Sequence, residues 1–199
     1  MRRAVLMSAV LALLVPGSVG AANRQVVIED NSFTPKNVRI AVGDLVRWSR
    51  AGDAFGEHNV RQSNRNPIFY SGPPTSNSAF SFRRRFSAGV FRYKCDVHGL
   101  IMSGVVNVPV AIGRAPAGLN FGVRWANGRT NTGTRFDVQF RVGSGKWRKW
   151  RTDTKTKVGV FGRGGRPVQV ANAKRYSFRA RSQKKKSESK WSPVRSFRP

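Results

Sequence analysis

The sequence predicts an all-β protein made of two β-sandwich domains. Three observations support this fold class. Apolar and polar residues alternate over short runs, as expected of half-buried strands. Clusters of Gly, Pro, Asn and Ser separate these runs, and no stretch has the spacing of an amphipathic helix. Many short strands at regular intervals are typical of sandwiches rather than of a parallel sheet.

Residues 1–22 are organised like an export signal. Arg2 and Arg3 give a positive start, an apolar run follows over residues 4–15, and small residues then offer a cleavage site. The apolar run is shorter than the roughly 20 residues that span a bilayer. We therefore expect cleavage near Asn23 and a mature chain without a transmembrane segment, which is secreted, periplasmic or attached to the cell envelope.

Charge divides the rest of the chain into two halves. Residues 23–113 carry 12 basic and 6 acidic side chains, whereas residues 114–199 carry 23 and 3. The segment Ala111–Gly118 is small, contains Pro and Gly, and interrupts the alternation on both sides, so we expect it to be the connector. The predicted domains are therefore 23–113 and 114–199.

The alternating runs predict the strands of both halves in order. In the first half they are residues 25–30, 38–42, 45–49, 89–95 and 104–110. In the second half they are residues 121–127, 135–142, 147–153, 158–162, 166–170, 175–182 and 190–197.

Scarce metal-binding side chains gather near the end of the first half. Cys95 is the only cysteine of the chain, and His98 and Met102 follow it closely. Alternation over residues 89–95 directs Cys95 inward at the end of a strand, with His98 and Met102 on the loop beyond. A lone cysteine in an exported chain pairs between chains, stays a free thiol or binds metal. The neighbouring histidine favours metal.

The donor types indicate which metal this would be. His58 is the only other histidine, and spacing alone leaves open whether it reaches Cys95. One thiolate, two imidazoles and a thioether are the ligand set of a blue (type 1) copper site, whereas zinc prefers more thiolates, a carboxylate or water. The sequence therefore predicts one copper ion held by His58, Cys95, His98 and Met102. Two histidines cannot supply further copper centres, so we expect no enzyme.

Three motifs of the first half occur in a recognisable order. They are "FTPKNVRIAVGDLVRW", "HNV" and "FRYKCDVHGLIMSGVV". Over residues 25–110 they resemble a cupredoxin of the plastocyanin and pseudoazurin kind, which implies a Greek-key β-sandwich and assigns the same four residues as copper ligands. The resemblance also gives Asn59 the role of a hydrogen-bonding residue that lies near the thiolate and stiffens the ligand loop.

The second half contains a different set of motifs. "VRWAN", "FDVQFRV", "RYSFRARS" and "KWSPVRSF" resemble the strands of a fibronectin type III domain over residues 116–197. The resemblance implies an immunoglobulin-like β-sandwich. It makes Tyr176 the corner tyrosine, whose hydroxyl bonds to backbone upstream. Modules of this fold attach or space other domains, and the fold alone names no partner.

The strong positive charge of the second half predicts an anionic partner. Lys184, Lys185 and Lys186 would lie at the tip of the last hairpin, either solvated or in contact with an anionic cell-envelope polymer, lipid surface or nucleic acid. No base-reading motif is present, so sequence-specific nucleic-acid binding is not expected.

Three functions fit these features. The leading prediction is an exported one-electron carrier with a basic module for attachment or spacing, whose redox partner the sequence does not identify. The alternatives are a copper-binding carrier or buffer, and an envelope adhesion protein in which the cupredoxin half is structural.

Overall fold

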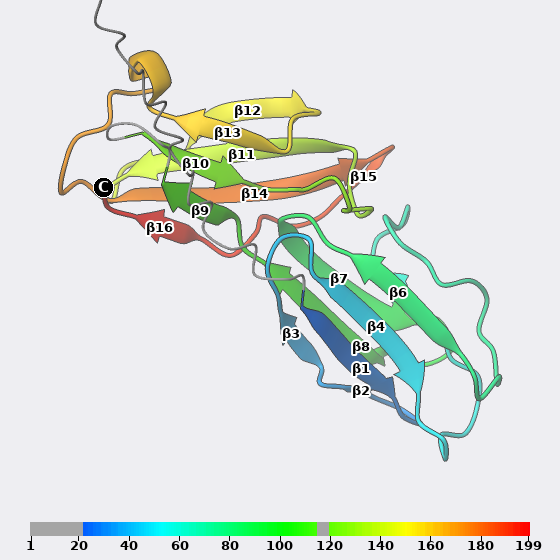
Figure 1. Ribbon diagram of the computed structural model, residues 1–199. Coiled ribbons are helices and arrows are strands. Elements are labelled where there is room, and N and C mark those ends of the chain that lie inside the picture. Colours follow the sequence, from blue (N-terminus) through cyan, green and yellow to red (C-terminus); the bar gives the residue numbers. More distant parts are fainter. Residues whose placement is uncertain (1–21, 115–119) are drawn as a thin grey trace, which may run out of the picture.

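The computed structural model describes residues 22–114 and 120–199, and these residues are all β apart from one turn of 3-10 helix at Arg163–Gly165 (Figure 1). The all-β prediction is confirmed. Nearly all of the predicted export signal lies outside the described residues. Within them, no helix has the length and apolar character needed to cross a membrane.

The first half is a sandwich of two four-stranded sheets. One sheet has the order β2-β1-β4-β6 and the other the order β3-β8-β7-β5. The pairs β1–β4 and β3–β8 are parallel, and the remaining neighbours are antiparallel. The strands are β1 (Asn23–Ile28), β2 (Phe33–Thr34), β3 (Asn37–Arg39), β4 (Leu45–Arg50), β5 (Arg61–Gln62), β6 (Ser81–Arg85), β7 (Gly89–Cys95) and β8 (Gly99–Val108).

The apolar faces of these two sheets form one core. Along β7 every second residue is buried, which places Phe91, Tyr93 and Cys95 between the sheets. Trp48 of β4 lies on the facing sheet, and its ring meets that of Tyr93 edge-on at a centroid distance of 5.3 Å. The strand that ends in Cys95 is therefore anchored by large aromatic side chains.

The second half consists of a three-stranded and a five-stranded sheet. The first has the order β13-β10-β9 and the second the order β12-β11-β14-β15, with β16 also paired to β14. All of these pairs are antiparallel. The strands are β9 (Ala111–Arg114), β10 (Phe121–Arg124), β11 (Arg135–Val142), β12 (Arg148–Thr154), β13 (Val158–Phe161), β14 (Tyr176–Lys184), β15 (Ser187–Glu188) and β16 (Arg195–Phe197).

Aromatic side chains also fill the second core. The ring of Phe161 lies 4.9 Å from that of Phe178 and 5.0 Å from that of Phe140. The hydroxyl of Tyr176 accepts a hydrogen bond from the backbone N–H of Ala171 at 2.9 Å. This is the upstream backbone contact that the resemblance implied for Tyr176.

Two predictions, one of the connector and one of a strand, differ from the structure. Ala111–Arg114, expected to begin the connector, is a strand that pairs with β10; the rest of that segment lies outside the described residues. Residues 166–170, predicted as a strand, form none. Pro167 removes a donor that a ladder would need. Val168 and Val170 still pack against the core of the second half, so the alternation reflects burial of a loop rather than a strand.

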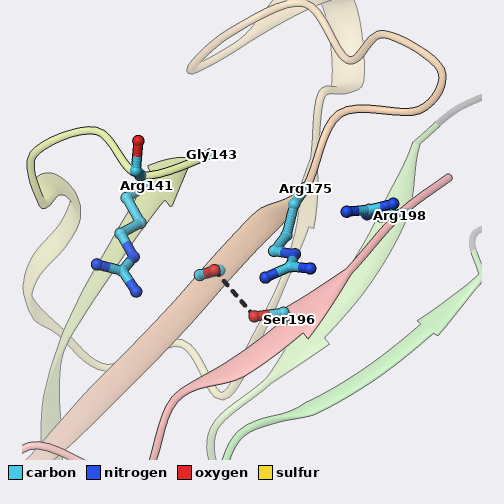
Figure 2. A pocket seen from close by; sticks show the side chains of 7 residues that line it. Arg141, Gly143, Arg175, Ser196 and Arg198 are labelled. Carbon is cyan, nitrogen blue, oxygen red and sulfur yellow. Dashed lines mark hydrogen bonds between the residues drawn. The ribbon is translucent and has the colours of Figure 1, made fainter.

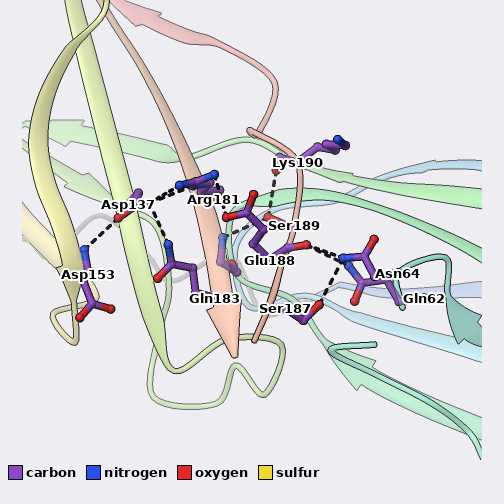
Figure 3. Close-up of polar contacts among 11 residues, drawn as sticks. Gln62, Asn64, Asp137, Asp153, Arg181, Gln183, Ser187, Glu188, Ser189 and Lys190 are labelled. Carbon is purple, nitrogen blue, oxygen red and sulfur yellow. Dashed lines mark hydrogen bonds and ion pairs between the residues drawn. The ribbon is translucent and has the colours of Figure 1, made fainter. Parts of the chain in front are cut away.

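The two halves contact each other through polar groups (Figure 3). Val90 and Lys190 exchange both backbone hydrogen bonds, at 3.0 and 3.1 Å. The Asn64 amide donates to the Glu188 carbonyl at 2.7 Å. The first pair of bonds joins β7 to the residues after β15, and the Asn64 bond joins the loop after β5 to β15 itself.

Candidate metal centre

Cys95 lies where β7 turns into the next loop. The antiparallel register with β8 is regular up to Lys94, which pairs with Ser103, and then shifts so that Cys95 pairs with Gly99. Gly99 has a φ of +59°, a left-handed conformation that glycine adopts without strain. The tight turn that results brings His98 back beside Cys95, as the sequence predicted for a strand–loop–strand unit.

His58 reaches the same place from the segment between β4 and β5, and β5 pairs with β7. Its backbone N–H and C=O both bond to Thr75, at 3.0 and 3.1 Å. The guanidinium of Arg50 donates to the carbonyl oxygens of Gly56 and Thr75, at 2.8 and 3.3 Å. These bonds hold the segment before His58 in one conformation, so the imidazole is fixed before any metal binds.

The three side chains converge on one point. One ligand atom from each of His58, Cys95 and His98 lies within 4.8 Å of the others. The two imidazole rings are 5.1 Å apart and inclined by 31°. His58 is 2% exposed and Cys95 is a buried free thiol. The long-range contact that spacing could not establish is therefore present.

Hydrogen bonding identifies which nitrogen of His58 is available to a metal. Its Nε2 lies 2.7 Å from the carbonyl oxygen of Phe55. A carbonyl can only accept, so Nε2 carries the proton and Nδ1 of the neutral ring keeps its lone pair. Nδ1 is buried and has no hydrogen-bond partner within residues 22–114 and 120–199. Burial lowers the pKa of His58, with smaller lowering effects from His98 and Arg50, against an opposing effect of the Phe55 carbonyl.

His98 repeats this pattern. Its Nδ1 is also buried without a hydrogen-bond partner in the described part of the chain. A buried polar atom without a partner costs free energy that a bound ion would recover. The Cys95 thiol has only a long contact, 3.9 Å from the Glu57 carbonyl oxygen. These donors fit a metal, and the group could bind one copper ion.

Asn59 links the two ligand-bearing segments. Its Oδ1 accepts from the backbone N–H of Asp96 at 2.8 Å, and its Nδ2 donates to the Asp96 carboxylate at 2.9 Å and to the Gly72 carbonyl at 3.0 Å. Arg61 pairs with the same carboxylate at 3.3 Å. Asn59 thus bonds to the residue directly after Cys95.

Sequence reasoning missed Asp96 and Arg61 as members of this network. Asp96 adjoins Cys95 in "CDVH", which is a local signal for a supporting role. Nothing local identifies Arg61 as its partner, because the two are 35 residues apart.

Met102 is buried in the same core as Cys95, but it lies within β8 and not on the loop where the sequence placed it, because β8 begins at Gly99. It directly precedes Ser103, whose partner across the ladder is Lys94. Met102 therefore lies between the register pairs Lys94–Ser103 and Cys95–Gly99, where the register of the ladder shifts.

The three predicted lysines are not members of this cluster. Lys184 is the last residue of β14, and its Nζ lies 3.5 Å from the Ile68 carbonyl oxygen. Lys185 and Lys186 are exposed and form the turn before β15.

Solved structures with a similar fold cover about half of this chain. A purple cupredoxin from Nitrosopumilus maritimus is 28% identical over 43% of this chain and 98% of its own, with a TM-score of 0.37. An amicyanin from Paracoccus versutus is 24% identical over 45% of this chain and 84% of its own, also with a TM-score of 0.37.

A copper-containing nitrite reductase from Thermus scotoductus is 27% identical over 47% of this chain, with a TM-score of 0.36, and the match spans only 25% of that enzyme. No protein-family model and no curated protein matches the sequence. At these TM-scores the similarities assign no function, which has to come from the side chains of the site.

Proposed function

We propose that this chain is an exported type 1 copper protein that carries single electrons, with residues 23–113 as a cupredoxin domain. The observation that carries the proposal is the buried cluster of two unpartnered imidazole nitrogens and one thiol. His58, Cys95 and His98 would hold the ion, and Met102 would supply a weak axial thioether. Copper would supply the one-electron redox change.

The donor set favours copper over zinc. The cluster contains one thiol and no carboxylate among the described residues, whereas structural zinc usually takes two or more thiolates and catalytic zinc keeps a water. Thiolate, imidazole and thioether together suit copper. Because two histidines serve the entire chain, no donors remain for a second copper centre of the kind that multicopper enzymes need.

Burial favours an electron carrier over a copper buffer. His58 and Cys95 are closed off from solvent, and hydrogen bonds hold both of their segments, which opposes release of the ion to an acceptor. Apolar residues at the start of β8, just after His98, are nevertheless exposed, with Leu100 at 78% and Ile101 at 81%. An exposed apolar surface next to His98 would let a redox partner approach the site closely.

The visible spectrum tests this proposal. Cupric ion added to the mature protein should give one equivalent of an intensely coloured complex, because a copper–thiolate bond forms. The Cys95→Ser variant should lose the colour while keeping its far-UV circular dichroism. A parent protein that binds no copper, or that stays colourless with copper bound, would refute the proposal.

For residues 114–199, together with the first residues of β9 from Ala111 onward, we propose a fibronectin type III module that attaches or spaces the copper domain. The division into a β9-β10-β13 sheet and a β12-β11-β14-β15 sheet supports this, as does the Tyr176 corner contact. The excess of basic residues supports an anionic envelope partner.

Export is proposed from the N-terminal signal. N-terminal sequencing of protein recovered outside the cytoplasm should begin near Asn23. Recovery of an uncleaved chain in the cytoplasm would contradict export.

A further inference from the structure

Three arginines of the second half line one hollow at the surface (Figure 2). Its volume is about 530 Å³. Arg141 belongs to β11, Arg175 directly precedes β14, and Arg198 directly follows β16. The other residues that line it are Gly143, Ser144, Ser177 and Ser196.

Backbone and hydroxyl hydrogen bonds fix the frame of this hollow. The N–H of Gly143 donates to the carbonyl of Arg175 at 2.8 Å, which ties the turn after β11 to the start of β14. The hydroxyls of Ser177 and Ser196 lie 2.9 Å apart across the β14–β16 ladder. The three arginines therefore project from segments whose relative positions are set by the sheet.

The charges around the hollow have no counter-charge. Its lining contains no carboxylate, and in the described part of the chain none of its three arginines forms a salt bridge. The Nε of Arg141 is buried and has no hydrogen-bond partner among the described residues. Three like charges around one hollow cost free energy, and an anion bound among them would recover it.

Neighbouring arginines on the same sheet have hydrogen-bond or salt-bridge partners for their guanidinium groups. Arg179 donates twice to the side-chain oxygen of Gln139, and Arg181 pairs with Asp137. Arg141 and Arg179 both stack on Trp147, with their Cζ atoms 4.8 and 4.3 Å from the ring centroid, but Arg141 forms no salt bridge in the described part of the chain. Stacking orients the Arg141 guanidinium without using its N–H groups, which leaves its terminal Nη groups for a ligand.

We propose that this hollow binds a phosphate group. Guanidinium forks match phosphate oxygens in pairs, and the two serine hydroxyls add further donors. The phosphate can be free in solution or part of an anionic polymer, because the chemistry of recognition is the same. This inference deepens the attachment role proposed for the second half, and it does not depend on the copper site.

Calorimetric titration of the mature protein tests the proposal, with inorganic phosphate and linear polyphosphate as probes at constant ionic strength. The Arg175→Gln/Arg198→Gln variant should lose about tenfold or more in affinity, because it removes charge-assisted hydrogen bonds. The matched control is Lys185→Gln/Lys186→Gln, which removes the same two charges from an exposed turn and should bind phosphate like the parent. Far-UV circular dichroism and thermal unfolding like those of the parent would show that each variant is folded.

The two probes distinguish the sources of phosphate. Binding of inorganic phosphate that depends on Arg175 and Arg198 indicates a site for the free anion, and arginine-dependent binding of polyphosphate alone indicates a polymer. Equal losses of affinity in both double variants would refute a site in the hollow, because they would show that phosphate binds through the overall positive charge. If polyphosphate binding depends only on Lys185 and Lys186, the attachment role survives and the hollow is refuted. A parent that binds neither probe refutes the hollow as well.

Discussion

Asn59 illustrates how single residues shape the candidate site. Its side-chain amide bonds to both the backbone and the carboxylate of Asp96, so the His58 and Cys95 segments are held by the same group. The Phe55 carbonyl holds the ring of His58 in the tautomer that leaves Nδ1 free. Ligand positions fixed before binding limit the rearrangement that accompanies a change of metal oxidation state.

Met102→Leu tests the axial position. The variant keeps the size and apolar character of the side chain but removes its sulfur. We expect the copper complex to stay coloured and its reduction potential to rise, because the axial thioether tunes the potential without making the copper–thiolate bond. Protein-film voltammetry measures the shift. An unchanged potential would mean that Met102 does not approach the ion.

Tyr93 makes the free energy of unfolding fall with pH in the alkaline range. Burial raises the pKa of Tyr93 to about 12. Its pKa in the folded state therefore lies above its unfolded value of about 10, so the stability it contributes is complete below pH 10 and is lost as the pH rises through about 12. The loss amounts to roughly 2–3 kcal/mol.

Urea unfolding between pH 8 and pH 12 measures this loss in the copper-free protein. Tyr93→Phe removes the titrating hydroxyl and should have a shallower alkaline decline than the parent. Equal slopes in parent and variant would show that other groups cause the decline.

At the scale of elements, a chain of buried hydroxyls joins the halves. Ser182 of β14 donates to the Ala88 carbonyl at 2.8 Å. Because the Ser182 hydroxyl donates there, its oxygen must accept from the Ser87 hydroxyl, 2.6 Å away. The Ser87 oxygen in turn accepts from the Thr132 hydroxyl at 3.1 Å. All three hydroxyls are buried. Each has one acceptor and one donor role, so removing one member leaves its neighbours unsatisfied.

Ser182→Ala should therefore destabilise the protein by about 1–3 kcal/mol. Thermal unfolding followed by circular dichroism measures the change, and the transition should broaden as the halves lose their coupling. Ser63→Ala, at an exposed serine, is the control and should change stability by less than about 0.5 kcal/mol. A similarly small effect of Ser182→Ala would show that this interface contributes little.

At the scale of the whole molecule, copper binding should be coupled to unfolding. The ligands come from segments far apart in the sequence, at His58 and at Cys95–His98, and converge only in the folded state. Copper at about 100 times its dissociation constant should therefore stabilise the parent by about 2.7 kcal/mol.

Differential scanning calorimetry with and without a chelator measures this effect. Because the halves are hydrogen-bonded to each other, the whole transition should shift to higher temperature rather than one part of it. Cys95→Ser should shift much less. An equal shift of the unfolding temperature in Cys95→Ser would mean that the stabilising copper binds outside the His58, Cys95 and His98 cluster.

Much of the fold and of the site could be predicted from local pattern. Alternation gave the strand β7 and the inward direction of Cys95, and it failed at residues 166–170, where Pro167 prevents a ladder although Val168 and Val170 pack against the core. The rarity of Cys and His in the chain singled out the ligands. The partnership of Asp96 with Arg61 and the meeting of Arg141, Arg175 and Arg198 could not be predicted.

By itself, the sequence determined the all-β class, the division of charge and the identities of the candidate metal ligands. These properties depend on side-chain chemistry and on the two-residue period of a strand, both of which are local. Only the tertiary structure decided that His58 meets Cys95, that its Nδ1 is free, and that three arginines surround one hollow. Those facts depend on the sheet order and on long-range register, which local residue preferences do not specify.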